Sequence, residues 1–204
     1  MRAPHFRYEN QMIKLGHRHV AGVDEVGRGP LAGPVTAAAV ILDPKRRPKG
    51  LADSKALSAA HRLALFDDIL GSALAIGIGM ASAVEIDAIN IRQATFLAMR
   101  RALNALSVKA DFALIDGNSL PPDLACSARA IVKGDAQSVS ISAASIVAKV
   151  TRDKLMAQLH ESYPVYGFEQ NAGYPTKFHR EALSKYGACP FHRLSFGPLK
   201  TLIS

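Results

Sequence analysis

The chain places two acids, Asp24 and Glu25, next to each other at the end of an apolar run. The turn Gly27-Arg28-Gly29 follows at once. Carboxylate oxygens are the ligands that hard cations such as Mg²⁺ and Mn²⁺ prefer, whereas a guanidinium suits a phosphate. These residue types side by side predict the centre of a metal-dependent nuclease.

A third acid, Asp116, stands in a similar setting, Ala-Leu-Ile-Asp-Gly-Asn at 113–118, and Asp135 follows another apolar run. Two divalent ions about 3.5–4 Å apart can flank a phosphodiester, and they need three or four acids from separate elements. Spacing alone does not single out Asp135. Four further aspartates also lie near expected element ends, namely Asp43, Asp53, Asp111 and Asp153.

Neighbouring residues of a regular strand point to opposite faces of the sheet. Asp24 and Glu25 can therefore share a site only if the strand ends or twists there, which the glycines that follow make easy. Asp116 ends a predicted parallel strand, where α/β sheets usually bind ligands. Taken one at a time, each of these aspartates is as well explained by a turn or a helix cap.

The elements that must position these acids alternate in an α/β pattern. Hydrophobic periodicity predicts strands over 19–24, 34–42, 74–81, 111–115 and 128–132, and helices over 58–70, 91–106, 142–160 and 175–186. Ser82 and Glu85 predict a capping box that opens a short extra helix. The first three strands should form an antiparallel meander, and the later helix-strand alternation predicts parallel pairing. Residues 1–18 should be irregular or weakly helical.

Composition sets the class of protein. The chain has 204 residues, 49% of them hydrophobic, and carries 25 Lys and Arg against 17 Asp and Glu, a net charge of +8. We expect a globular protein with a polyanionic partner; the alternative is that the charge serves only solubility. Two distant cysteines argue against a disulfide framework or a zinc site. Without an apolar signal core or membrane span, we expect a cytoplasmic monomer with no membrane partner.

Several residues are candidates for contacting a nucleic acid. The two glycines of Gly27-Arg28-Gly29 allow main-chain groups to approach a sugar. Tyr174, in Gly-Tyr-Pro-Thr, has a ring that could stack on a nucleotide sugar or simply pack. Ser54 and Lys55 suit phosphate contact. Lys149 and Arg152 are expected either to contact phosphate or to lie on a solvated helix face. Three further residues are expected to line the same groove, namely His179, His192 and Arg193. Local packing is expected of Tyr163, Tyr166 and Phe168.

Over about residues 19–199 the chain resembles the prokaryotic ribonuclease HII family. The matching stretches are Ala-Gly-Val-Asp-Glu-Val-Gly-Arg-Gly-Pro at 21–30, Asp-Ser-Lys at 53–55, Leu-Ile-Asp-Gly-Asn at 114–118, Lys-Gly-Asp at 133–135, Ser-Ala-Ala-Ser-Ile-Val-Ala-Lys-Val-Thr-Arg-Asp at 142–153, Gly-Tyr-Pro-Thr at 173–176 and His-Arg-Leu-Ser-Phe-Gly-Pro at 192–198. The resemblance implies a ribonuclease H-like fold, with a mixed five-stranded sheet flanked by helices and a helical C-terminal segment. It implies a single catalytic domain, with a core over about 19–160 and a substrate segment over 161–204.

The resemblance also implies an activity and residue roles. The expected reaction is cleavage of RNA within RNA–DNA hybrids and on the 5′ side of a ribonucleotide embedded in duplex DNA, as in DNA replication and repair. Asp24, Glu25, Asp116 and Asp135 match the quartet that binds Mn²⁺ or Mg²⁺. Gly27-Arg28-Gly29 matches the triplet that contacts the ribose 2′-OH, and Tyr174 matches the residue that wedges against the next deoxyribose.

One departure and two competing functions remain. Many relatives have His-Lys before Gly-Tyr-Pro-Thr, but this chain has Asn171-Ala172, so a positive group is missing from that loop. Another nuclease of the same fold class, such as a resolvase or exonuclease, would share the acids without needing the sugar contact. A non-catalytic nucleic-acid-binding module is disfavoured, because clustered acids repel phosphate unless a cation lies between them.

Overall fold

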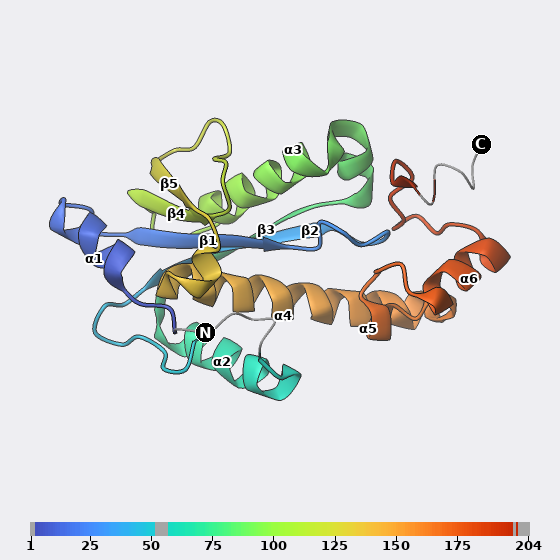
Figure 1. Ribbon diagram of the computed structural model, residues 1–204, viewed down its shortest axis with the longest axis horizontal. Coiled ribbons are helices and arrows are strands. Elements are labelled where there is room, and N and C mark those ends of the chain that lie inside the picture. Colours follow the sequence, from blue (N-terminus) through green and yellow to red (C-terminus); the bar gives the residue numbers. More distant parts are fainter. Residues whose placement is uncertain (1–2, 52–56, 198, 200–204) are drawn as a thin grey trace.

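A mixed five-stranded sheet in the order β3-β2-β1-β4-β5 forms the centre of the computed structural model, which describes residues 3–51, 57–197 and 199 (Figure 1). The strands are β1 Val20–Val26, β2 Val35–Leu42, β3 Ala73–Ala81, β4 Phe112–Asp116 and β5 Ser127–Ile131. β1, β2 and β3 pair antiparallel, whereas β4 pairs parallel with both β1 and β5. The predicted meander and the later parallel pairing are both confirmed.

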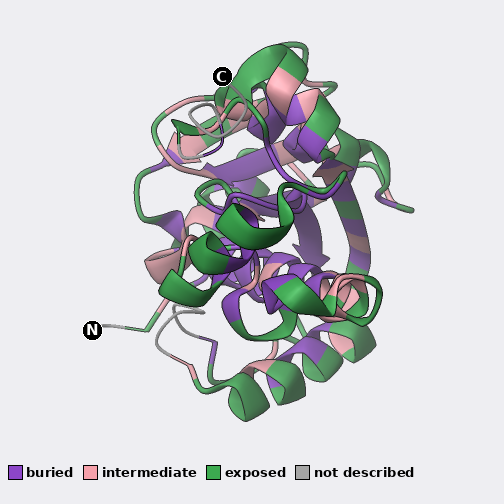
Figure 2. Cartoon of the chain, turned by 90° about the vertical axis from the view of Figure 1, so that its right-hand side faces the viewer, coloured by how far each residue is buried: buried purple, intermediate pink, exposed green. Residues whose placement is uncertain are grey.

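Helices cover both faces of the sheet. They are α1 Arg7–Lys14, α2 Ala59–Ser72, α3 Ala83–Asn104, α4 Val139–Ser162, α5 Phe168–Asn171 and α6 Lys177–Tyr186, with two 3₁₀ turns, η1 Gly134–Ala136 and η2 Pro164–Tyr166. α3 packs on one face, and α4 and α2 pack on the other (Figure 1). β2 is buried along its whole length, as expected for a strand that is apolar at every position except Thr36. Figure 2 shows the buried residues gathered in the sheet and on the inner helix faces.

Local signals placed most helix starts correctly. The capping box of Ser82 and Glu85 is present, and Ser58, Ser138 and Thr176 cap α2, α4 and α6. The predicted short helix and the longer helix from about Ile91 are both present as the two parts of α3, which are separated at Asn90, where φ is 67° and ψ is 162° and the backbone is not helical. The side chain of Asn90 accepts hydrogen bonds from the next turn and restarts the helix.

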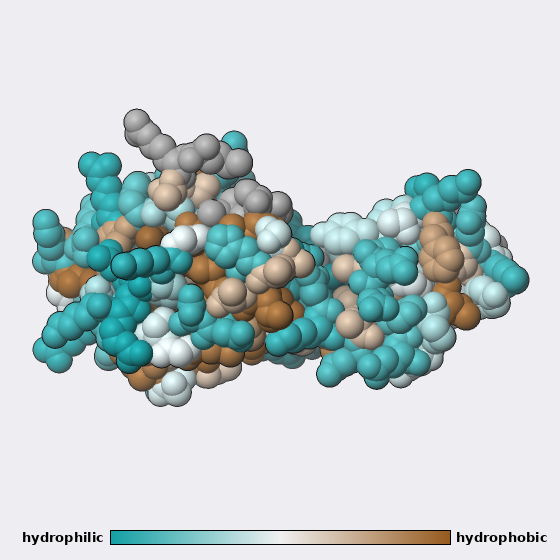
Figure 3. Space-filling view, turned by 90° about the horizontal axis from the view of Figure 1, so that it is seen from below, coloured by the Kyte–Doolittle hydropathy of each residue, from teal (hydrophilic) through white to brown (hydrophobic). Residues whose placement is uncertain are grey.

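The C-terminal segment forms a smaller lobe around the end of α4. Its core includes Met156, Tyr166 and Phe168, so the expected packing roles of the two aromatic residues are confirmed. Seen from below, the molecule narrows between the sheet body and this lobe (Figure 3). Among the described helices, none combines the length and apolarity needed to cross a bilayer. Ser54 and Lys55 lie outside the described residues.

Candidate active site

The end of the β1–β4 pairing lets the two adjacent acids share a site. β1 pairs with β2 as far as Val26, but its pairing with β4 stops at Val23 opposite Ile115. Asp24 points to the α4 side of the sheet, where it is hydrogen-bonded by Ser145. Glu25 lines a hollow on the α3 side. Because no β4 residue pairs with β1 beyond Val23, the two carboxylates can approach each other around this edge.

Three carboxylates converge there. Ligand atoms of Asp24, Glu25 and Asp116 all lie within 4.8 Å of one another. Asp116 is the last residue of β4, the position at which a parallel strand delivers a side chain to the site. A second hollow, of about 310 Å³, is lined by these three acids together with Asp135 of η1, and we call it the acid hollow. The structure therefore brings the predicted quartet together, with Asp135 at the margin of the three-acid cluster.

Burial and mutual repulsion disfavour the charged form of this cluster. Asp24 is 5% exposed. Its pKa is raised well above 3.8, first by burial and then by the charges of Glu25 and Asp116. Burial also raises the pKa of Glu25, against the opposing effect of Arg28, and that of Asp116. A bound cation would relieve this repulsion, which makes the cluster electrostatically suited to a metal.

Hydrogen bonds fix the direction of each carboxylate. The main-chain N–H of Gly134 donates to Asp116 Oδ1 at 2.6 Å, and that of Glu25 donates to Asp24 Oδ1 at 2.7 Å. Sequence reasoning missed Ser145 as a partner of Asp24. It stands one helical turn before Lys149, which lines the same hollow, so the spacing of four residues in the 142–153 motif was an available signal.

The Gly27-Arg28-Gly29 loop lies beside the acids. Gly27 has φ +90°, and a β-carbon there would collide with Nε of Arg152, so no other residue fits. A β-carbon on Gly29 would lie 3.6 Å from Cε1 of Tyr174. Tyr174 is 43% exposed and lines the hollow of the acids. The loop, the tyrosine and the carboxylates therefore border one continuous surface, with Arg28 exposed and 3.3 Å from Glu25.

Two fully buried arginines hold this loop from beneath. Arg193 donates to the carbonyl oxygens of Gly27, Arg28 and Gly33 at 2.6–3.1 Å. Arg152 donates to those of Ala32, Pro34 and Ala172 at 2.9–3.0 Å. We call these two side chains the arginine clamp. Among the described residues, no carboxylate lies within 4.0 Å of either guanidinium.

The clamp corrects two sequence expectations. Arg152 is 0% exposed, so it is neither a phosphate contact nor part of a solvated helix face. Arg193 is also 0% exposed and does not line a groove. Burial lowers the pKa of Arg193 to about 9, with the charge of Arg152 as the next cause. Both arginines satisfy main-chain carbonyls that the irregular 27–34 segment leaves unpaired.

His179 and His192 also do not line the groove. They are 0% and 2% exposed, and their Nε2 atoms lie 3.0 Å apart in the core of the C-terminal lobe. Burial lowers the pKa of His192 to about 4, so the pair is neutral near pH 7. Its role is to support the loop that carries Tyr174, whose carbonyl oxygen lies 2.9 Å from Nδ1 of His179.

The Asn171-Ala172 departure has a structural role in this chain. Asn171 is buried, donates from Nδ2 to the carbonyl of Tyr166 at 2.7 Å, and accepts from the N–H of Gly173 at 2.8 Å. Its amide thus ties the turn before Tyr174 to the core of the lobe. A neutral residue suits position 172 because Arg152 already places a positive charge next to the carbonyl oxygen of Ala172.

The donor set fits a hard divalent cation. All its donors are carboxylates, and the described residues add no histidine or cysteine to the group. The partly exposed Glu25, Asp116 and Asp135 leave room for solvent and substrate oxygens. This chemistry matches Mg²⁺ or Mn²⁺ equally well.

Comparison with known proteins is consistent with this site. The family model described as Ribonuclease HII matches residues 21–198. Ribonuclease HII of Rhizobium etli is 56% identical over 197 residues, covering 97% of this chain and 86% of the relative. Ribonuclease HII of a Marinomonas species is 56% identical over 184 residues, covering 90% of this chain and 92% of the relative.

Solved structures agree. The ribonuclease H2 from Pyrococcus horikoshii superposes with a TM-score of 0.77 at 28% identity, over 91% of this chain and 97% of that one. The RNase HII of Archaeoglobus fulgidus, solved as a complex with PCNA, gives 0.75 at 25% identity, over 88% of this chain and 96% of that one. The chain therefore belongs to the ribonuclease HII family and is a metal-dependent ribonuclease H, a hydrolase acting on RNA-containing nucleic acid.

Proposed function

We propose that this chain is an endonuclease that cuts the RNA strand of RNA–DNA hybrids and the 5′ side of a single ribonucleotide embedded in duplex DNA. One observation carries the proposal. The three-carboxylate cluster shares its hollow with Tyr174 and borders the glycine loop, so groups suited to cleavage and groups suited to sugar recognition face one surface. A nuclease indifferent to ribose would not need the second set.

Asp24, Glu25, Asp116 and Asp135 would hold two divalent ions, Mn²⁺ or Mg²⁺. When bound, such ions activate water and neutralise charge on the departing oxygen. The water oxygen forms a bond to phosphorus in line with the bond that breaks, between phosphorus and the 3′ oxygen of the preceding nucleotide. That oxygen leaves with a proton, giving 3′-OH and 5′-phosphate ends. The 2′-OH is then a recognition group and takes no part in bond formation.

The protein's own groups position the ribonucleotide. Main-chain groups of Gly27 and Gly29 can approach the 2′-OH because neither residue has a side chain. Lys149 lines the hollow of the four acids and Arg28 lines the neighbouring hollow on the α3 side, and both cations are suited to phosphates of the substrate. Tyr174 would pack against the deoxyribose that follows. Ser54 and Lys55 are proposed phosphate contacts on the sequence match alone, and we propose that the protein works as a monomer in the cytoplasm.

End-labelled duplexes test the proposal directly. Wild-type protein with Mg²⁺ or Mn²⁺ should cut a DNA duplex carrying one ribonucleotide at its 5′ side, cut a hybrid, and leave matched all-DNA and all-RNA duplexes intact. Asp116→Asn should remove most cleavage while leaving the far-UV circular dichroism unchanged. Asp123→Asn, an exposed aspartate outside the site, is the matched control. Products with 2′,3′-cyclic phosphate ends, or comparable cleavage of all-DNA duplex, would refute the mechanism.

A further inference from the structure

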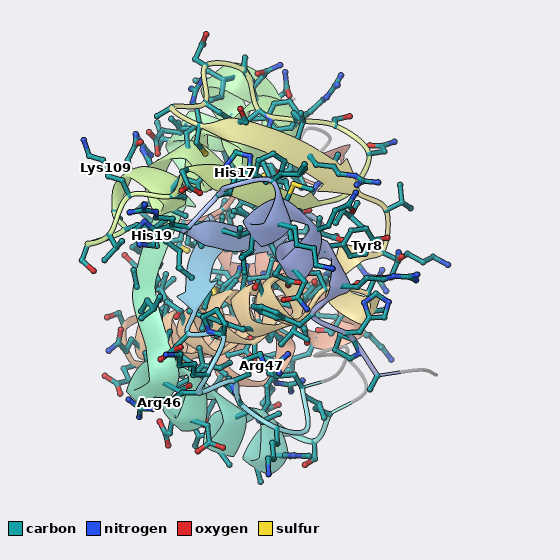
Figure 4. All side chains as sticks on the ribbon, turned by 90° about the vertical axis from the view of Figure 1, so that its left-hand side faces the viewer. Tyr8, His17, His19, Arg46, Arg47 and Lys109 are labelled. Atoms are coloured by element: carbon teal, nitrogen blue, oxygen red, sulfur yellow. The ribbon has the colours of Figure 1, made fainter. Side chains whose placement is uncertain are left out.

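A basic groove lies at the end of the molecule formed by α1. It is lined by His5, Phe6, Arg7, Asn10, Gln11, Lys14 and Arg47, and we call it the α1 groove. Figure 4 views this end directly, with Tyr8 on α1 and Arg47 on the loop after β2. The α1 groove and the acid hollow have no lining residue in common. It is therefore a surface separate from the candidate active site.

The groove has cations but no carboxylate. The only acid of α1, Glu9, is 0% exposed and turned inward, where it accepts hydrogen bonds from the hydroxyl of Ser138 at 2.6 Å and the N–H of Ser140 at 2.9 Å. Among the described residues, no acid lies within ion-pair distance of Arg7, Lys14 or Arg47. Their charges are therefore available to a partner.

The groove is also firmly attached. Glu9 ties α1 to the start of α4, and the hydroxyl of Tyr8 donates to Oε1 of Gln137 at 3.0 Å. Gln137 directly follows η1, the turn that carries Asp135. Arg7 and Lys14 are consequently presented by a helix that is fixed to the framework of the active site, so a partner that binds them needs to order little of the protein.

The aromatic rings of this end are already covered. The guanidinium of Arg47 lies 4.8 Å from the centre of the Phe6 ring. Tyr8 has His5 stacked on it at 5.9 Å and Arg129 at 5.5 Å. The rings of Phe6 and Tyr8 thus already have partners, which argues against their stacking on unpaired bases. What remains is a set of fixed cations, the chemistry that contacts a phosphate backbone without reading sequence.

The position of the groove sets the length of nucleic acid it could reach. α1 packs near the amino ends of β1 and β4, with Met12 contacting the cluster of Val20 and Leu114. The acids stand at the carboxyl ends of the same strands. A seven-residue strand spans about 23 Å, and a duplex rises about 3.4 Å per base pair. A duplex that runs along β1, a strand of seven residues, would therefore extend about 7 base pairs beyond the scissile position to contact both surfaces.

We propose that the α1 groove is a second binding site for the phosphate backbone of the substrate duplex, contacting the flank remote from the cut. The inference rests on the proposed function for the identity of the duplex. The α1 groove adds to the affinity for a duplex only when the duplex is long enough to reach it, and this added affinity does not depend on base sequence or on the 2′-OH. An acidic protein or an anionic membrane would be drawn to the same charges, but neither has the fixed geometric relation to the acid hollow that a continuous duplex has.

Binding of short and long duplexes tests the proposal. The duplexes carry one ribonucleotide, and the flank that would reach the α1 groove is about 5 or about 20 base pairs long. Binding is measured by fluorescence anisotropy with Ca²⁺ or without metal. The double variant Arg7→Gln, Lys14→Gln is compared with Lys109→Gln, Lys154→Gln, which removes the same charge at exposed positions outside the groove. Full-length protein is used, and the thermal midpoint checks that each variant folds.

The expected result is a loss confined to the long duplex. The groove variant should bind it roughly three- to tenfold more weakly, with the log-log salt slope reduced by about 2, and should bind the short duplex like wild type. The control variant should match wild type on both. Equal weakening on both lengths, an equal effect of the control, or unchanged binding of the long duplex would overturn the inference. So would vesicles of anionic lipid that bind wild type but not the groove variant while duplex binding is unchanged. Loss of the proposed function would show instead as a wild type that binds the duplexes but does not cut them.

Discussion

At the scale of single residues, the acid cluster trades stability for function. Three carboxylates held within 4.8 Å repel one another, and burial of Asp24 adds the cost of removing its charge from water. The fold tolerates this because Ser145 and main-chain N–H groups direct the oxygens inward. A site built for a cation is thus a source of strain in the metal-free protein.

The first prediction concerns this strain. Because the pKa of Asp24 is raised on folding, its favourable contribution to stability is present at pH values near 4 and is lost as the pH rises through the folded-state pKa. Metal-free Asp24→Asn should therefore unfold at a higher temperature than wild type near pH 8, by about 2–8 °C, and the difference should shrink on acidification. Scanning calorimetry in chelator between about pH 4.5 and pH 8 measures it. Added Mn²⁺ should stabilise wild type more than the variant, and a variant less stable than wild type near pH 8 would contradict the interpretation.

The second prediction concerns Tyr174. Its ring stands opposite Gly29, the residue is 43% exposed, and it lines the same hollow as the acids. Tyr174→Ala should reduce cleavage at a single embedded ribonucleotide by roughly 10–100-fold, because the ring orients the junction for in-line attack. Binding of a hybrid should change much less. Tyr186→Ala, which removes a similarly exposed ring from α6, is the control and should cut normally. Normal junction cleavage by Tyr174→Ala would leave the ring as surface packing.

At the scale of elements, the arginine clamp joins parts of the chain that are far apart in sequence. Arg193 and Arg152 reach the 27–34 segment from the C-terminal tail and from α4, and Arg152 also reaches Ala172 next to the tyrosine loop. The N–H of Leu31 also donates to the carbonyl of Gly173 at 2.8 Å, which joins the 27–34 segment directly to the tyrosine loop. The sugar-recognition loop and Tyr174 are therefore held at one spacing by buried main-chain contacts.

The third prediction tests this connection. Arg193→Lys retains charge but cannot fan out to Gly27, Arg28 and Gly33 together, because an ammonium lacks the planar fork. It should lose roughly 2–4 kcal/mol of stability in urea. At a temperature where it stays folded, KM for the embedded ribonucleotide should rise and its preference over all-DNA duplex should fall. Arg101→Lys, an exposed arginine on α3, is the control. Full wild-type selectivity in folded Arg193→Lys would reduce the clamp to a purely stabilising role.

The elements were largely predictable from sequence, but the clamp was not. Apolar periodicity and the capping box of Ser82 and Glu85 located the predicted strands and helices to within a few residues, because those signals are local. Arginine is almost never fully buried, so Arg152 and Arg193 suggested a surface. Their true role follows from the unpaired carbonyls of a glycine- and proline-rich loop, which becomes visible only when the chain is folded. Asp135 likewise needed the family resemblance, because several other aspartates had equivalent spacing.

At the scale of the whole molecule, a chain of net charge +8 carries its most concentrated acids where phosphate must bind. Without a cation, those acids repel the substrate that the rest of the surface attracts. The repulsion by the acids and the attraction by the basic surface can be separated by experiment, because the repulsion depends on metal and the attraction depends on salt. Removing acid charge should help binding only while the metal site is empty.

The fourth prediction follows from that separation. In chelator, Asp24→Asn with Asp116→Asn should bind an RNA–DNA hybrid roughly tenfold more tightly than wild type, since two negative charges near the phosphate are removed. With Ca²⁺ present, wild type should gain affinity and the difference should shrink or reverse, because only wild type recruits the cation. Both proteins should lose affinity between about 50 and 200 mM salt with similar slopes, as the cations that contact phosphate are unchanged. Anisotropy titrations across salt, with and without Ca²⁺, give all these quantities, and Asp67→Asn with Asp68→Asn on α2 controls for overall charge. If that control tightened binding as much as the site variant, net charge alone would account for the effect and the acids would have no special place in the phosphate path.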